Sequence, residues 1–152
     1  MKKALVMVLV ALFLISGCSN NTAVDEKTDV WALVKEIKED VIVVDEVTYI
    51  TPEDTEIIEE LKLTEQDLIN GYYIHNPEEI LTEYKLTDET VYNFIDWHND
   101  FVEEGEDRNY STTKREEFIE YLESYIDSQP KMPFLFEVSG KNVISVTEIM
   151  MM

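Results

Sequence analysis

Apolar and polar residues alternate in short runs along most of the chain, and apolar residues recur at helical spacing in two further segments. The alternating runs are rich in β-branched and aromatic residues and predict seven strands, at 30–38, 41–50, 72–75, 80–86, 91–97, 134–138 and 143–150. Two sets of side chains share a face by this alternation: Trp31, Leu33 and Ile37, and then Val41, Val43, Val47 and Tyr49. Asp45-Glu46 interrupts the second run, which predicts a bulge or a strand that leaves the sheet.

Two helix starts are predicted. At 51–54 Thr51 can cap, Pro52 suits the first helical position, and acids favour the positive end of the helix dipole. A shorter helical turn is expected at 64–67. Thr113 and Glu116 have capping-box spacing. The apolar stripe that follows them consists of Phe118, Ile119, Leu122, Tyr125 and Ile126.

The predicted order of elements is ββα, βββ, αββ. Neighbouring strands are expected to pair as hairpins, including 80–86 with 91–97, and the polar segment 98–110 is expected to be a loop. Local pairing favours an α+β fold with a mostly antiparallel seven-stranded sheet, curled into a small, partly open barrel with two short helices. An open α+β sheet is the alternative.

The first seventeen residues have the three parts of a secretory signal peptide. Lys2 and Lys3 precede an unbroken apolar run at 4–15, and the small residues Ser16 and Gly17 follow it. As a helix this run would be about 18 Å long at 1.5 Å per residue. A hydrocarbon core is about 30 Å thick, so the run is too short to span it.

Ile15-Ser16-Gly17-Cys18 resembles the lipobox of bacterial lipoproteins. The resemblance implies that Cys18 receives a diacylglyceryl group and becomes the first residue of the mature chain. It also implies attachment to the cell membrane on the extracytoplasmic face, because two acyl chains anchor stably. The alternative is an unmodified thiol beside an ordinary signal peptide. Cys18 is the only cysteine, so disulfides cannot stabilise the fold.

Three regions follow from this pattern: a signal peptide at 1–17, a lipidated cysteine with a polar tether at 18–29, and one globular domain at 30–152. The chain carries 33 acidic and 12 basic side chains, and loss of Lys2 and Lys3 leaves the mature chain at −23. Such a charge opposes binding to nucleic acid or to an anionic lipid surface.

The acidic segment 96–107 is the best candidate for a cation site. Its acidic residues are Asp96, Asp100, Glu103, Glu104, Glu106 and Asp107. Calcium prefers six to eight oxygen ligands, and Gly105 allows a sharp turn. The spacing does not match an EF-hand loop, so a solvated acidic loop is the alternative.

Six aromatic residues are candidates to line a groove for a carbohydrate or a peptide, because aromatic faces with polar tips suit such ligands. They are Tyr72, Tyr73, Tyr84, Tyr92, Trp97 and Tyr110. The alternative places them in the core and at sheet edges. No nucleophile motif, phosphate loop or dinucleotide fingerprint occurs, and no cofactor is expected.

Several further segments resemble small Gram-positive lipoproteins. They are 70–77, 95–97, 116–118, 121–122 and 146–149. This resemblance implies no activity and no site residue. We therefore expect a monomeric, non-enzymatic binding or interaction module with a protein or cell-wall polymer as partner. Calcium binding by the acidic loop and a hydrolase with paired carboxylates are the alternatives.

Overall fold

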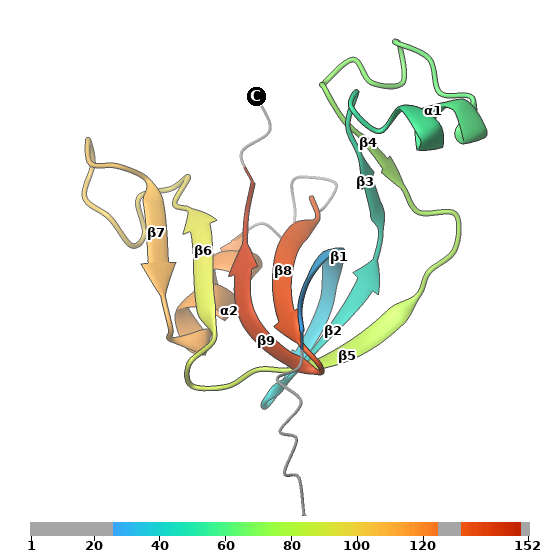
Figure 1. Cartoon of the computed structure of the whole chain (residues 1–152). Coiled ribbons are helices and arrows are strands. Elements are labelled where there is room, and N and C mark those ends of the chain that lie inside the picture. Colours follow the sequence, from blue (N-terminus) through green and yellow to red (C-terminus); the bar gives the residue numbers. More distant parts are fainter. Residues whose placement is uncertain (1–25, 125–131, 150–152) are drawn as a thin grey trace, which may run out of the picture.

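The fold is built around one seven-stranded mixed sheet, with two short helices and a separate two-stranded sheet (Figure 1). The computed structural model describes residues 26–124 and 132–149. The strands of the large sheet are β1 (Lys27–Lys38), β2 (Val41–Glu46), β5 (Leu81–Lys85), β6 (Val91–Ile95), β7 (Asn109–Thr112), β8 (Phe134–Ser139) and β9 (Asn142–Thr147). Their spatial order is β5-β2-β1-β8-β9-β6-β7, and only β5–β9 and β6–β9 pair in parallel. The α+β class and the mostly antiparallel sheet are confirmed.

Five of these strands, β5, β2, β1, β8 and β9, close into a ring of backbone hydrogen bonds. The closure is narrow: Lys85 pairs with Asn142, and its N–H donates to the Lys141 carbonyl at 2.7 Å. The long β1 allows the ring to form, because its first half pairs with β8 and its second half with β2. Ala32, at the junction, pairs with both neighbours. The predicted curl therefore takes the form of a ring of five strands, which β6 and β7 extend beyond β9.

The buried face of β1 and β2 is opposite to the face that carries Trp31 and Leu33. The buried side chains are Ala32, Val34, Ile42 and Val44. A register shift between Val34 and Glu36 then turns Ile37 back against the core. A β-bulge adds one residue to one strand and inverts the alternation beyond it. The prediction that Trp31, Leu33 and Ile37 share one face is therefore wrong.

Helix α2 (Arg115–Ser124) packs its aromatic side chains against β6. Phe118 is fully buried and stacks on Tyr92 at 4.8 Å, while Tyr121 stacks on Phe94 at 4.1 Å. These rings join the core inside the ring of strands into one cluster. The helix predicted after Thr113 is confirmed, and the last two residues of its predicted stripe, at 125–126, lie outside the described residues.

Residues 48–75 form a projection that we call the arm, at the upper right of Figure 1. It contains β3 (Thr48–Ile50), α1 (Thr55–Leu61) and β4 (Tyr73–His75), and among the described strands β3 pairs with β4 alone. The break at Asp45-Glu46 is thus a strand leaving the large sheet.

Helix α1 begins later than predicted, because Asp54 and not Thr51 precedes its first turn. Asp54 accepts hydrogen bonds from the N–H and the hydroxyl of Thr51 at 2.7 and 2.8 Å, which closes a turn before the helix. Thr64 and Asp67 repeat this arrangement, so the expected helical turn at 64–67 is a hydrogen-bonded turn.

The predicted hairpin of 80–86 with 91–97 is wrong. β5 pairs with β2, whereas β6 pairs in parallel with β9 and antiparallel with β7. The polar turn between them carries the chain along one edge of β9, from Asn142 to Ser145, and the Thr90 hydroxyl donates to the Val143 carbonyl at 2.9 Å. A turn pattern shows that the chain changes direction, but it does not determine with which strand the next strand will pair. β7 lies partly in the segment that was expected to be a loop. The apolar pattern did not reveal this strand, because Tyr110 is its only apolar residue.

The described chain begins at the end of the molecule opposite to the arm. Lys27 pairs with Ser139 beside the β8–β9 turn, at the bottom of Figure 1. The predicted tether is shorter than expected, because residues 27–29 already belong to β1. The predicted signal peptide, Cys18, the tether up to residue 25 and the end of the last predicted strand at Met150 lie outside the described residues.

Candidate binding surface

The structure separates the six aromatic residues that were expected to line a groove. Tyr92 is fully buried, its ring stacks on Phe118, and its hydroxyl lies beside Arg115. Burial raises the pKa of Tyr92, and the Arg115 guanidinium opposes this only in part. Tyr84 is buried as well and donates to Glu46 Oε1 at 2.8 Å. Burial, followed by this hydrogen bond, raises the pKa of Tyr84 to about 12. Neither ring has a surface that could line a groove.

Tyr110 and Trp97 lie around the other end of β6. The Tyr110 ring packs on Phe94 and Phe101, at 5.4 and 5.2 Å between centroids. Its hydroxyl donates to Glu117 at 2.9 Å, and this bond, followed by burial, raises the pKa of Tyr110. Trp97 is 41% exposed, and its Nε1 donates to Glu148 at 3.4 Å. Trp97 is therefore the one member of this pair that presents a large surface to solvent.

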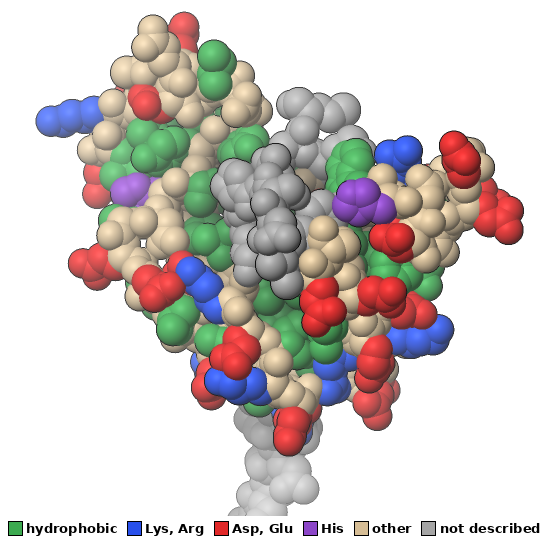
Figure 2. Space-filling view, turned by 180° about the vertical axis from the view of Figure 1, so that it is seen from behind, with side chains coloured by type: hydrophobic (Ala, Val, Ile, Leu, Met, Phe, Trp, Pro, Cys, Tyr) green, Lys and Arg blue, Asp and Glu red, His purple; other side chains and the backbone are tan. Residues whose placement is uncertain are grey.

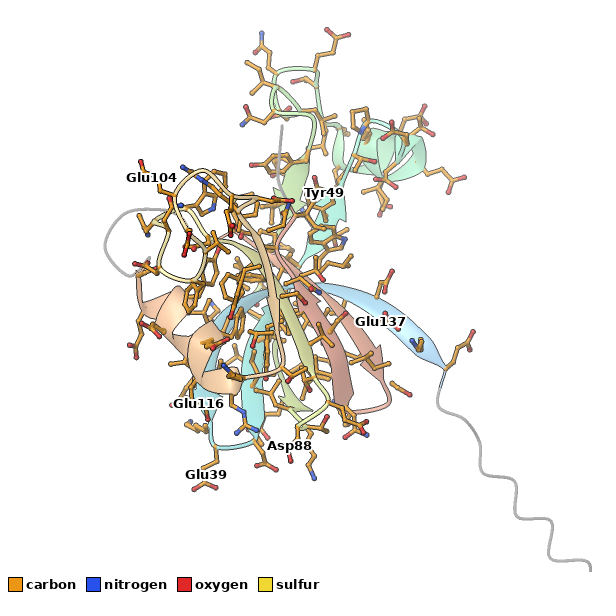
Figure 3. The ribbon with its side chains drawn as sticks, turned by 90° about the vertical axis from the view of Figure 1, so that its left-hand side faces the viewer. Glu39, Tyr49, Asp88, Glu104, Glu116 and Glu137 are labelled. Carbon is orange, nitrogen blue, oxygen red and sulfur yellow. The ribbon has the colours of Figure 1, made fainter. Side chains whose placement is uncertain are left out.

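Tyr72 and Tyr73 lie on the arm, and Tyr72 belongs to a stack of three rings that the sequence pattern did not group together. Trp31 stacks on Tyr49 at 4.2 Å, and Tyr49 stacks on Tyr72 at 5.5 Å. The Tyr72 hydroxyl also donates to Met132 Sδ at 3.8 Å. Figure 3 places Tyr49 at the base of the arm. Because Tyr49 has a ring on both faces, the stack fastens the arm to β1 and is not an open platform for a sugar.

A buried carboxylate, Asp45, holds the segment by which the chain returns from the arm. Its Oδ1 accepts the Ile80 N–H at 2.9 Å, and its Oδ2 accepts the Asn76 Nδ2 at 3.0 Å and lies 3.1 Å from Lys35 Nζ. Lys35 also pairs with Glu79 at 2.8 Å. Burial raises the pKa of Asp45, but these donors outweigh it, so the pKa lies below its ordinary value.

Four large apolar side chains are strongly exposed among the described residues: Ile69 (79%), Ile80 (56%), Leu81 (56%) and Trp97 (41%). Three of them lie in the arm and its return segment, and Trp97 lies after β6. Ile69 lies in the turn before β4, and Ile80 and Leu81 lie where the chain rejoins the large sheet. Helix α1 has no fully buried residue, so its apolar side chains are only half covered as well. Figure 2 shows hydrophobic side chains at the surface of the arm, at its upper left.

In the acidic loop, Asp96 is a structural residue. It is buried, and its carboxylate accepts the backbone N–H groups of Asp100, Phe101 and Val102 at 2.8–2.9 Å. Burial raises the pKa of Asp96, but the hydrogen bonds from these N–H groups lower it by more, so the pKa lies below its ordinary value. Its oxygens are already occupied by donors, and a cation would have to displace them.

The other acids of this loop point to no common site. Asp100, Glu103, Glu104, Glu106 and Asp107 are exposed, and Figure 3 shows Glu104 at the outer tip. Within the described ranges, no group of three or more His, Cys, Asp or Glu side chains is placed to hold a metal ion. Calcium binding and the hydrolase alternative stay predictions.

In residues 26–124 and 132–149, no helix is long and apolar enough to span a membrane. Comparison with protein-family models, with curated proteins and with solved structures found no significant match to this chain.

Proposed function

We propose that this chain is a lipid-anchored, non-enzymatic binding module, held on the extracytoplasmic face of the cell membrane through Cys18. The observation that carries the proposal is the strong exposure of three large apolar side chains, Ile69 in the arm and Ile80 and Leu81 in its return segment. A folded domain ordinarily scatters its exposed apolar residues singly, so the occurrence of three of them within residues 69–81 favours an interaction surface there.

The position of the arm suits this role. The described chain begins beside the β8–β9 turn, whereas the arm lies at the other end of the molecule (Figure 1). Cys18 precedes Lys27 by nine residues, a distance of up to about 30 Å when extended. An anchor on Cys18 would therefore hold the domain by the end opposite to the arm and leave the arm directed away from the bilayer.

The buried polar groups of the described residues also favour binding over catalysis. Asp45 and Asp96 are the buried carboxylates, and each is fully engaged in holding a loop. A general acid or base needs access to its substrate, and neither of these groups is accessible.

The anchor is tested by replacing its attachment point. Mass spectrometry of the mature wild-type protein should find an acylated Cys18, and the protein should fractionate with membranes. Cys18→Ser should be released from them. A bare thiol in the wild-type protein, or a membrane-bound Cys18→Ser variant, would contradict the anchor.

The binding surface is tested by photo-crosslinking on intact producing cells. A photoreactive residue at position 69 should give a discrete crosslinked product. The same residue at position 88 should not, because Asp88 is exposed at the opposite end of the molecule (Figure 3). Equal products from both positions, or none from position 69, would count against the arm as the binding surface.

A further inference from the structure

The exposed apolar side chains of the arm and its return segment lie within a strongly acidic part of the described chain. Residues 48–81 contain nine acidic side chains and a single basic residue, Lys62. Asp54 and Asp67 are engaged in turns with threonines, and Glu79 pairs with Lys35. The remaining glutamates are Glu53, Glu56, Glu59, Glu60, Glu65 and Glu78. All six are exposed, and none forms an ion pair within the described ranges.

This combination selects among the partners that could cover the apolar side chains. A second copy of the chain would bring the same negative charge to the contact, and so would an anionic lipid surface or a polyanionic wall polymer. Tyr49 offers a neutral glycan no open aromatic face, because Trp31 and Tyr72 cover both faces of its ring. A cationic polypeptide complements the charge, and its apolar side chains can cover Ile69, Ile80 and Leu81.

We propose that the arm binds a basic polypeptide segment that carries apolar side chains. The inference rests on the proposed function, since it names the partner class of the same surface. The apolar contacts provide the anchor, and the six exposed glutamates attract the segment and align it. The affinity should fall with added salt, because exposed charges are screened beyond about 10 Å at 0.1 M ionic strength.

The test uses the full lipidated chain in a non-ionic detergent and three synthetic peptides of equal length. The first peptide contains Lys and Leu, the second Lys and Ser, and the third Glu and Leu. The Lys/Leu peptide should bind saturably, and hydrogen exchange should slow within residues 48–81. The Lys/Ser peptide should bind at least tenfold more weakly, which corresponds to about 1.4 kcal/mol. The Glu/Leu peptide should not bind.

Three variants locate the contact: one single substitution and two double charge reversals. Ile69→Ser should weaken binding of the Lys/Leu peptide by about tenfold if this side chain is a main anchor. Glu59→Lys with Glu60→Lys on α1 should weaken it as well. Glu103→Lys with Glu104→Lys makes the same charge change in the other acidic loop and should leave the affinity nearly unchanged.

Three results would overturn the inference: equal binding of the Lys/Ser peptide, slowed exchange centred on 98–108, or equal losses in the two charge-reversal pairs. Each would mean that the acidic surface attracts cations without a particular site. The crosslinking test from position 69 is independent of partner chemistry. A crosslink without Lys/Leu binding therefore retains the proposed function and rejects only the basic partner.

Discussion

At the scale of single residues, two buried carboxylates hold the least regular parts of the chain in place. Asp45 accepts hydrogen bonds from Asn76 and Ile80 and forms an ion pair with Lys35. Asp96 accepts hydrogen bonds from backbone N–H groups of the acidic loop. Both oxygens of each carboxylate accept hydrogen bonds. Only an ionised carboxylate presents acceptors on both oxygens, because a carboxamide replaces one of them with a donor.

Asp45→Asn should therefore destabilise the protein by about 2 kcal/mol, since either amide orientation points its NH₂ group at a donor. Urea denaturation measures this change. Glu79→Gln is the matched control, because Glu79 is 60% exposed at its side chain and pairs with the same lysine. The control should change stability by less than about 1 kcal/mol. Equal effects of the two substitutions would contradict the role given to Asp45.

The pH dependence of this difference follows from the lowered pKa of Asp45. A carboxyl group with a lower pKa in the folded state stabilises that state at pH values above its unfolded pKa, which is about 3.9. This contribution is lost as the pH falls through the folded pKa. The stability difference between wild type and Asp45→Asn should thus be constant near neutral pH and shrink below about pH 4. A difference that grows on acidification would contradict this assignment.

At the scale of elements, the arm is a small unit attached at two places. The stack of Trp31, Tyr49 and Tyr72 fastens β3 to the bend of β1, and Asp45 fastens the return segment. Within the arm only Ile50 is fully buried, so its own core contributes little. Its orientation depends mainly on these two attachments.

Tyr49→Ala should loosen the arm without unfolding the large sheet, because it removes the middle ring and both stacking contacts. Hydrogen exchange should accelerate in residues 48–75 and stay unchanged in β8 and β9. The cost in global stability should be about 1–2 kcal/mol. Tyr73→Ala is the control, since Tyr73 lies beside Tyr72 but outside the stack. Faster exchange throughout the sheet in Tyr49→Ala would instead place the residue in the main core.

At the scale of the whole molecule, the excess of acidic side chains dominates the surface. The chain has a formal charge of −21, and Figure 2 shows acidic side chains distributed over the visible face with fewer basic ones. Among residues 26–124 and 132–149 few of these charges are paired, and the ion pairs that do form are mostly exposed. Self-repulsion on this scale opposes the compact state.

Sodium chloride should therefore stabilise the protein by screening this repulsion. The urea midpoint should rise between low and moderate salt while the slope of the transition stays constant. Charge reversal of Glu103 and Glu104 to lysine should reduce the salt effect, because fewer like charges remain. A midpoint that falls with salt would show that attractive ion pairs outweigh the repulsion.

The sequence by itself determined most of the strand and helix segments, the α+β class, the hairpin of β8 with β9 and the break in the strand at Asp45-Glu46. These features depend on periodicity and on turn chemistry, which act over a few residues. Only the tertiary structure decided that β5 and β6 do not pair with each other, that Ala32 and Val34 face the core, and that Trp31, Tyr49 and Tyr72 form a stack. Such contacts join segments far apart along the chain, so the packing of all strands at once selects them. A local pattern contains no information about that choice.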